Sequence, residues 1–449
     1  MRGKTRKKLL PTQVIAISFA LVILIGAIAL CLPVASRSGQ SLGFGTSLFT
    51  ATSATCVTGL ILGDTWTLWS GFGQAVIITL IEIGGLGFMS IASLVIFMLR
   101  RKIGLRQKLV IAQALSVEEM ADVVSIQKWV LLGSLIIQTT GALVLFVRFL
   151  PDYGWMQAAK WGVFHAISAF CNAGFDILGN VSGCTGLMYF SNDPVVLITL
   201  MVLIVVGGLG FFVWQEIALR HSFRKFQVYT KLVLIMTGVL ILTGAVLFGA
   251  LEWNNPQTLG GMPIGQKLLN ACFQSVTTRT AGFAAIDQAA MTDGSKALSV
   301  LLMLIGGASG STAGGIKMVT VLVLVLFVVS RARGRSTVTV FHRTIPLGKV
   351  LDAATLTALV LGLAFVGAVF ITVTSPVGFT DALYETASAL ATVGLTAGVT
   401  PLLSVPAQIM IIIFMYFGRV GILTLSLGFM MGDRAEERFR YADTNVLIG

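Results

Sequence analysis

Long apolar segments recur along this chain, separated by short polar or basic stretches. The hydrocarbon core of a bilayer is ~30 Å thick, so a helix needs about 20 apolar residues to cross it. The segments that meet this requirement come in pairs, and we predict eight transmembrane helices from them. The expected spans are residues 14–34, 69–99, 124–150, 191–219, 228–251, 296–330, 349–375 and 404–431.

A shorter amphipathic element lies between the two members of each pair. It has about ten to twelve residues, too few to cross a bilayer, and it leads into a tetrapeptide with glycine at its third position. The first copy begins Phe49-x-Ala51-x-Ser53-Ala54, and the other three follow or diverge from this pattern at the same distance from their glycines. Non-helical backbone is tolerated at membrane depth only where protein buries it or where it lines a water-filled cavity. We therefore predict re-entrant pore helices and loops.

The four tetrapeptides are the strongest candidates for chemistry. They read Val57-Thr58-Gly59-Leu60, Asn172-Ala173-Gly174-Phe175, Thr280-Ala281-Gly282-Phe283 and Thr392-Val393-Gly394-Leu395. A cation that loses its hydration shell needs a ring of oxygen atoms, which main-chain carbonyl groups can supply. Glycine permits the required backbone because it tolerates positive φ. One such glycine is typical of an ordinary helix end, but four copies predict a single cation pathway lined by the first three residues of each tetrapeptide.

The repetition divides the chain into four units of span, re-entrant helix and loop, and span, related by pseudo-fourfold symmetry. We expect an all-α integral membrane protein. The units cover residues 12–100, 120–220, 228–335 and 349–432, and residues 433–449 form a cytoplasmic tail.

A second repeated motif of small residues lies inside the second span of each unit. Its copies are Gly84-Gly85-Leu86-Gly87, Gly207-Gly208-Leu209-Gly210, Gly306-Gly307-Ala308-Ser309-Gly310 and Gly418-Arg419-Val420-Gly421. Small side chains at these positions fit close helix packing, and they fit the lining of a pore equally well.

The second span of the third unit is interrupted by small and hydroxyl-bearing residues, which weaken helix propensity. The interruption consists of Gly306, Gly307, Ala308, Ser309, Gly310, Ser311, Thr312, Ala313, Gly314, Gly315, Ile316 and Lys317. We predict a non-helical loop inside the membrane, beneath the tetrapeptides, where it would block the pathway. A kinked helix with tight packing is the alternative.

Charged residues inside the predicted spans need partners. Arg419 lies in the fourth small-residue patch, where an unpaired cation costs several kcal/mol in hydrocarbon. We expect Arg419 to bond carbonyl oxygens of the loop or the carboxylate of Glu82, or to form a positive barrier below the tetrapeptides. For Glu82, contact with a neighbouring helix is the alternative. For Lys317, the alternative to a role in the gate is a side chain that reaches the cytoplasmic boundary.

The composition excludes a soluble protein. Hydrophobic residues make up 56% of the chain and charged residues only 11%, against about 25% in soluble domains. The net charge is +12, but the basic residues gather between the spans without the interleaved aromatic residues that bind nucleic acid. Most of them fall on one predicted side, so the positive-inside rule places both termini in the cytoplasm.

Two other functional classes have a sequence feature in their favour. The segment Gly307-Ala308-Ser309-Gly310 has the look of a membrane-embedded serine protease motif. Such an enzyme needs a base within hydrogen-bonding distance, and His165, His221 and His342 are expected elsewhere, so we predict no enzyme. The interrupted span also fits a sodium-coupled secondary transporter with a broken helix. Such transporters usually have two inverted repeats, whereas this chain has four of one orientation.

Four such units with one glycine per tetrapeptide resemble the Trk/Ktr/HKT superfamily of potassium transporters. Within it they are most similar to the KtrB-type membrane subunits of bacterial KtrAB systems, over about residues 12–445. The resemblance implies potassium uptake, with sodium as a second candidate ion, through a selectivity filter at Gly59, Gly174, Gly282 and Gly394. It also implies that residues 306–317 are the gate and that an arginine stands at position 419.

The same resemblance implies the location and the partners. It implies a multi-pass homodimer in the bacterial plasma membrane. It also implies a cytosolic KtrA-type nucleotide-binding ring, docked on the basic loops, that binds ATP or ADP. On this chain no covalently bound cofactor is expected.

Overall fold

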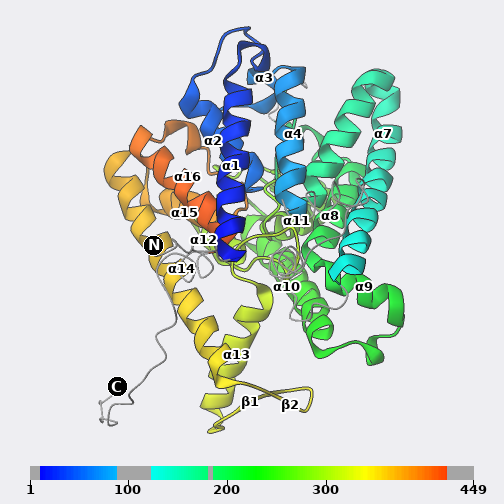
Figure 1. The fold of residues 1–449 in the computed structure, drawn as a ribbon, viewed down its shortest axis with the longest axis vertical. Helices are drawn as coiled ribbons and strands as arrows, with labels where there is room; N and C mark the ends of the chain where they lie inside the picture. Colours follow the sequence, from blue (N-terminus) through cyan, green and yellow to red (C-terminus); the bar gives the residue numbers. More distant parts are fainter. Residues whose placement is uncertain (1–10, 88–122, 180–185, 422–449) are drawn as a thin grey trace, which may run out of the picture.

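The computed structural model describes residues 11–87, 123–179 and 186–421, and these residues are mostly helical (Figure 1). Four of the described helices are long and apolar enough to cross a bilayer, and a bent pair makes a fifth if it is counted as one span. The predicted all-α, multi-pass membrane fold is therefore confirmed. The number of eight spans stays a prediction, because parts of the spans expected at 69–99 and 404–431 lie outside the described residues.

The first unit contains one long helix and three shorter ones. They are α1 (Pro11–Cys31), α2 (Phe44–Thr55), α3 (Thr65–Leu68) and α4 (Gly71–Leu86), with a short 3-10 turn, η1 (Pro33–Ala35), after α1. Asp64 and Ser70 cap α3 and α4 by accepting hydrogen bonds from the backbone N–H groups of Thr67 and Gly73. Helix α2 packs against both α1 and α4, so the short helix lies between the two longer ones.

The helices of the second unit are interrupted at two glycines, Gly154 and Gly210. Helix α7 (Val123–Phe170) kinks at Gly154, whose φ of 73° is not helical, shortly after Pro151. After η2 (Gly186–Phe190), α8 (Pro194–Leu209) and α9 (Phe211–Arg220) meet at 94°. The span expected at 191–219 is therefore bent, and it is one span only if α8 and α9 are counted together.

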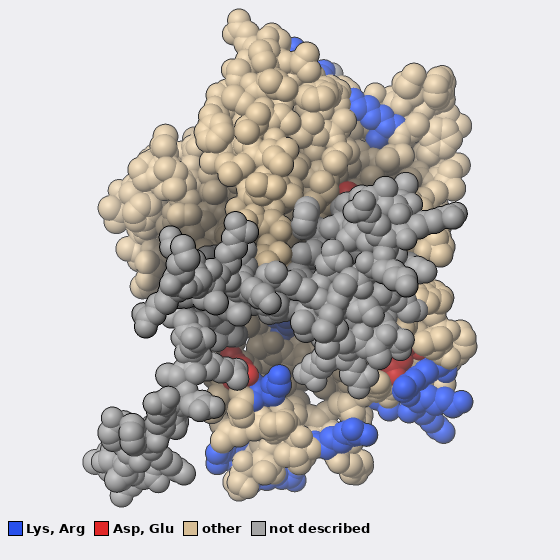
Figure 2. Space-filling view, viewed as in Figure 1, with Lys and Arg blue, Asp and Glu red and all other residues tan. Residues whose placement is uncertain are grey.

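The third and fourth units complete the chain. Their elements are η3 (Phe223–Lys225), α10 (Val228–Glu252), α11 (Ile264–Thr277), α12 (Asp293–Leu304), α13 (Met318–Ala332), β1 (Val338–Val340), β2 (Arg343–Ile345), α14 (Leu347–Thr374), α15 (Phe379–Ala391), η4 (Thr400–Leu402) and α16 (Val405–Val420). Strands β1 and β2 form an antiparallel hairpin at the end of α13 (Figure 1). Lys and Arg side chains gather at this same end of the molecule (Figure 2), as expected for a cytoplasmic face.

The interior of the molecule contains buried hydroxyl groups beside its apolar core, and many large apolar side chains also face outward. The short helices α2 and α15 are largely buried, including hydroxyl groups such as that of Ser53. On the long helices, Val373 is 80% exposed and Leu242 is 67% exposed. An apolar outer surface around buried, hydrogen-bonded polar groups is the arrangement that a lipid environment favours.

The short helices and the long helices form a closed circle of contacts. The helix that leads into each tetrapeptide packs against a later helix of the preceding unit: the kinked helix α7 against α4, α11 against α8, α15 against α12, and α2 against α16. The last contact joins the first unit to the fourth. This circular order agrees with pseudo-fourfold symmetry, while the unit boundaries stay predictions.

The small-residue patches allow close approach to the ends of the short helices. A Cβ on Gly84 would collide with the carbonyl oxygen of Thr55, at the end of α2. The same relation pairs Gly207 with Phe170 and Gly418 with Leu390. In the third unit Gly306 instead meets Gly314 of its own loop. Close packing therefore explains three of the four patches.

The last glycine of each of these three patches also ends a helix. Gly87, Gly210 and Gly421 have φ values of 84°, 90° and 94° and directly follow α4, α8 and α16. Positive φ is incompatible with a continuing α-helix, and glycine adopts it without steric cost. The second spans are thus interrupted part of the way along, which the apolar pattern alone did not predict.

Gly207→Ala is expected to destabilise the fold by about 1–3 kcal/mol, because its Cβ would meet the backbone carbonyl of Phe170. Thermal unfolding of the detergent-solubilised protein measures this as a lower Tm. Gly238→Ala is the matched control, since Gly238 lies on an exposed face of α10 and a Cβ there meets nothing within 4 Å. Equal unfolding temperatures for the two variants would contradict the packing explanation.

Candidate functional site

The four tetrapeptides share one backbone conformation. In each, the glycine and the non-glycine residue two positions before it have positive φ. The φ values are 56° and 95° for Val57 and Gly59, 59° and 68° for Asn172 and Gly174, 68° and 84° for Thr280 and Gly282, and 50° and 93° for Thr392 and Gly394. Positive φ is uncommon for a residue with a side chain and is an outlier for valine and threonine. Its recurrence at matching positions shows that the surrounding structure imposes it.

The four glycines form a closed ring. A Cβ on Gly59 would collide with the carbonyl oxygen of Ala173, the residue before Gly174. The same contact runs from Gly174 to Ala281, from Gly282 to Val393 and from Gly394 to Thr58. Because the last contact returns to the first unit, the four tetrapeptides surround one axis. We call this arrangement the glycine ring; it leaves no space for a side chain at any of the four positions.

In the first and fourth units a serine hydroxyl fixes the glycine. The Oγ of Ser53 accepts a hydrogen bond from the N–H of Gly59 at 3.0 Å. The Oγ of Ser388 accepts one from the N–H of Gly394, also at 3.0 Å. Both serines are fully buried, so each hydroxyl is a fixed part of the ring's support.

In the second and third units the hydroxyl donates instead. Ser168 donates to the carbonyl oxygen of Phe175 at 2.7 Å, and Thr277 donates to that of Phe283 at 2.6 Å. No role was predicted for these hydroxyl groups, although the repeated spacing of the serines indicated one. Thr277 was harder to find because Val276 occupies the serine position in the third copy.

Buried polar groups also support the chain beyond the ring. Glu385 of α15 is fully buried and accepts hydrogen bonds from the hydroxyls of Thr396 and Thr400. Thr396 lies two residues beyond the fourth glycine, so this carboxylate ties the outer loop to the short helix. At the equivalent position of the second unit, Nε2 of His165 lies 3.4 Å from the N–H of Ile177. Sequence reasoning missed Glu385, and an acid in the middle of a predicted re-entrant helix was the available signal.

Two carboxylates lie close together in the loops beyond the first two glycines. Burial, reinforced by the nearby carboxylate of Asp64, raises the pKa of Asp176 to about 6. Asp176 therefore takes up a proton at a higher pH than an ordinary aspartate does. It adds negative charge to this side of the ring only above its pKa.

Residues 306–317 lie beneath the ends of the short helices. The chain between α12 and α13 is not helical, so the break expected from the sequence is present. Thr312 donates its hydroxyl to the carbonyl of Phe170, at the end of α7, at 3.1 Å. A Cβ on Gly314 would collide with the hydroxyl of Thr392, the first residue of the fourth tetrapeptide. The loop is thus in direct contact with the base of the ring.

Arg419 of α16 donates hydrogen bonds to three carbonyl oxygens. One belongs to Thr312 in the loop, and the other two belong to Gly84 and Gly85 near the C-terminal end of α4. Carbonyl groups in the last turn of a helix have no intrahelical partner and carry partial negative charge. Arg419 therefore links the fourth unit, the first unit and the loop of the third.

Glu82 is not the partner of Arg419. Its carboxylate accepts a hydrogen bond from Nε2 of Gln138 on α7 at 3.0 Å. No ion pair joins Glu82 to Arg419 within the described ranges. Glu82 points from α4 toward α7, whereas the glycine carbonyls that bind Arg419 lie at the end of the helix.

Lys317 donates to the carbonyl of Ala313 at 2.7 Å, within its own loop.

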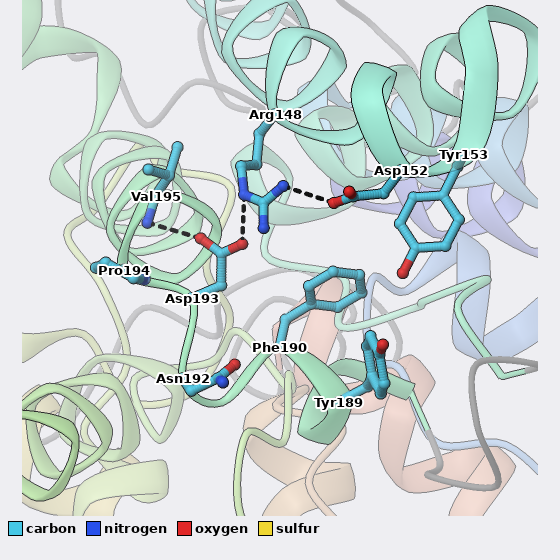
Figure 3. A pocket seen from close by; sticks show the side chains of 9 residues that line it. All are labelled: Arg148, Asp152, Tyr153, Tyr189, Phe190, Asn192, Asp193, Pro194 and Val195. Atoms are coloured by element: carbon cyan, nitrogen blue, oxygen red, sulfur yellow. Dashed lines mark hydrogen bonds and ion pairs between the residues drawn. The ribbon is translucent and has the colours of Figure 1, made fainter. Parts of the chain in front are cut away.

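A separate cavity of about 820 Å³ lies between α7, η2 and the start of α8 (Figure 3). Its charged groups satisfy one another: Arg148 contacts Asp193 at 2.6 Å and Asp152 at 2.8 Å, and Asp193 also caps α8. None of its lining residues belongs to a tetrapeptide or to the loop. This cavity is therefore distinct from the ring.

The ligands that the ring can offer are oxygen atoms of the main chain. In the part of the chain that the structure describes, no three His, Cys, Asp or Glu side chains come together in a way that could hold a metal ion. Carbonyl oxygens held in a ring replace the hydration shell of a cation without a net charge of their own. The geometry thus suits reversible passage of a cation.

The sequence matches the TrkH family, described as a cation transport protein, over residues 6–438. It is 39% identical to the Potassium/sodium uptake protein NtpJ of Enterococcus hirae, over 100% of this chain and 99% of that protein. It is also 39% identical to the Ktr system potassium uptake protein B of Bacillus subtilis, over 98% of this chain and 97% of that protein.

A solved structure has the same fold. The crystal structure of the potassium transporter TrkH from Vibrio parahaemolyticus matches with a TM-score of 0.72, over 95% of this chain and 86% of that one, at 17% sequence identity. The family match covers most of the chain, and the two relatives match over nearly their full lengths. The resemblance seen in the sequence is confirmed, and this chain belongs to the TrkH family of cation transport proteins.

Proposed function

We propose that this chain takes up potassium across the plasma membrane of a bacterial cell, with the glycine ring as its selectivity filter. The observation that carries the proposal is the closed circle of contacts between each glycine and the carbonyl before the next. Carbonyl oxygens can replace the water around a potassium ion when the backbone presents them as a ring. Both relatives named above are potassium uptake proteins by name, which supports the same ion here.

The orientation of the short helices supports a cation. Helices α2, α7, α11 and α15 all end within a few residues of their tetrapeptides. The C-terminal end of a helix carries a partial negative charge. Four such ends directed at one ring lower the energy of a positive ion there and raise that of an anion.

The gate in this proposal is the loop of residues 306–317 together with Arg419. The loop contacts the base of the ring through Gly314, and Arg419 bonds the loop carbonyl of Thr312. A positive side chain and a folded loop below a cation filter both oppose conduction. Opening then requires these hydrogen bonds to break.

The partners belong to the same proposal. We infer a homodimer whose cytoplasmic loops dock a KtrA-type ring, with ATP or ADP bound to that ring. One relative's name assigns it to a Ktr system, and Lys and Arg side chains gather at the end of the molecule that bears α9 and the β-hairpin (Figure 2). Both termini then lie in the cytoplasm, although residues 1–10 and the tail at 433–449 fall outside the described residues.

Sodium coupling is the second candidate. The E. hirae relative is named for both potassium and sodium, and the broken helices around residues 306–317 resemble those at ion sites of secondary transporters. Potassium uptake that stops without a sodium gradient would favour this alternative, whereas uptake driven by potassium alone favours the filter.

Purified protein in proteoliposomes is expected to take up rubidium, a potassium substitute, faster than empty vesicles do. The ring supplies oxygen ligands for a dehydrated ion of this class. Radioactive rubidium uptake measures the rate, with unlabelled potassium and sodium as competitors. Stronger competition by sodium than by potassium would contradict potassium selectivity.

Gly59→Ser is expected to lower the preference for potassium over sodium by about tenfold, because a Cβ there collides with Ala173 and the backbone has φ of 95°. Competition of sodium with rubidium uptake measures the preference. Gly45→Ser is the matched control, because Gly45 is exposed on α2 and a Cβ there meets nothing within 4 Å. An unchanged ion preference in Gly59→Ser would remove the filter assignment.

Arg419→Ala is expected to raise the rubidium uptake rate by about tenfold, because charge-assisted bonds that hold the loop are lost. Deletion of residues 308–314 should raise it further. Arg331→Ala, at the end of α13, removes an equal charge away from the loop and should have no effect. The gate assignment fails if uptake at equal protein content is the same in all these variants.

A further inference from the structure

The second unit holds the centre of the loop. The N–H of Ala308 donates to the carbonyl of Gly208 at 3.0 Å, and the N–H of Phe211 donates to the carbonyl of Gly310 at 2.9 Å. These bonds are available because α8 and α9 are bent by 94°. In a continuous helix the same groups would bond within the helix. The bend between α8 and α9 is therefore where the loop binds.

A tyrosine side chain adds a bond at the same place. Tyr229, in the first turn of α10, donates its hydroxyl to the carbonyl oxygen of Ser309 at 3.1 Å. Beside this bond, Ala308 packs in an apolar cluster with Val213 of α9 and Val233 of α10. The hydroxyl thus bonds the loop between the two residues whose main chains pair with the bend.

Tyr229 is itself held in place by α9. The carboxylate of Glu216 accepts hydrogen bonds from the N–H of Gln227, at 2.7 Å, and from the hydroxyl of Thr230. These residues stand two positions before and one position after Tyr229. Glu216 also pairs with Arg220 at 3.0 Å. The start of α10 is therefore fixed to α9, and the tyrosine hydroxyl is directed at the loop.

We propose that Tyr229 is a positioning residue for the gate, and that its hydroxyl holds Ser309 so that the loop stays beneath the glycine ring. The inference rests on the gating role proposed for residues 306–317. Loss of the hydroxyl shifts the loop toward its released arrangement. The exposed corner between α9 and α10 is then connected to the loop through Glu216, which fixes the start of α10, and Tyr229.

Tyr229→Phe removes only the hydroxyl and tests the proposal. Initial rubidium uptake into proteoliposomes is expected to rise about fivefold, as for the loss of one net hydrogen bond. The half-saturating rubidium concentration and the preference over sodium should not change, because the ring is untouched. Tyr416→Phe is the matched control: its hydroxyl also donates to a backbone carbonyl, that of Ala16 at 2.7 Å, but between α16 and α1.

Hydrogen–deuterium exchange of residues 306–317 gives a second readout that does not depend on transport. The loop amides should exchange about fivefold faster in Tyr229→Phe than in the wild type or in Tyr416→Phe. Unchanged exchange overturns the proposal, and so does faster exchange with unchanged uptake. An equal effect of Tyr416→Phe on both readouts also overturns it. If wild-type vesicles take up no rubidium, the proposed function fails instead, and exchange alone decides whether Tyr229 holds the loop.

Discussion

Main-chain carbonyl groups at membrane depth have no bulk water to bond, and this constraint governs the centre of the protein. Most of the exposed helix ends there are covered. Glycines pack against the carbonyl groups that end α2, α7 and α15, and Arg419 takes two carbonyls of α4. The carbonyl groups before the ring glycines are different, since each lies against the glycine of the neighbouring tetrapeptide around one axis. In the function that we propose, a cation is the partner that completes the oxygen ring.

The third unit departs from the others wherever the loop is involved. The hydroxyl that supports its tetrapeptide belongs to Thr277, one position later than the serines that do this in the other units. Gly306 packs against Gly314 of its own loop, whereas the equivalent glycines pack against the end of a short helix. Residues 306–317 connect α12 to α13 without forming a helix, and they lie under the ring. Because a single chain supplies all four units, the third can carry the gate that we propose while the other three keep the packing around the ring.

Much of the site could be predicted from the sequence because its signals are local. Glycine at a fixed distance after a short amphipathic element identified the four tetrapeptides, and a run of small residues identified the break at 306–317. The convergence of the tetrapeptides followed from their repetition alone. Their role in conduction stays a prediction.

The sequence left alternatives open where the answer depends on direction in space. The motif Gly207-Gly208-Leu209-Gly210 was expected inside a span, either for close packing or as part of a pore lining, and its last glycine also ends α8 and redirects the chain. Glu82 lies close to Gly84 in sequence, yet it points toward Gln138 of α7. No local pattern specifies which neighbour a helical side chain meets, because that depends on how the helices pack.

The hydroxyl groups behind the ring act in two opposite senses, as acceptors for Gly59 and Gly394 and as donors beyond Gly174 and Gly282. The quadrants are therefore chemically unequal despite their common shape. In an assembly of four identical subunits every mutation appears four times at the axis. Here a single mutation alters one quadrant and leaves the other three as they were, so in the filter that we propose each quadrant can be changed separately.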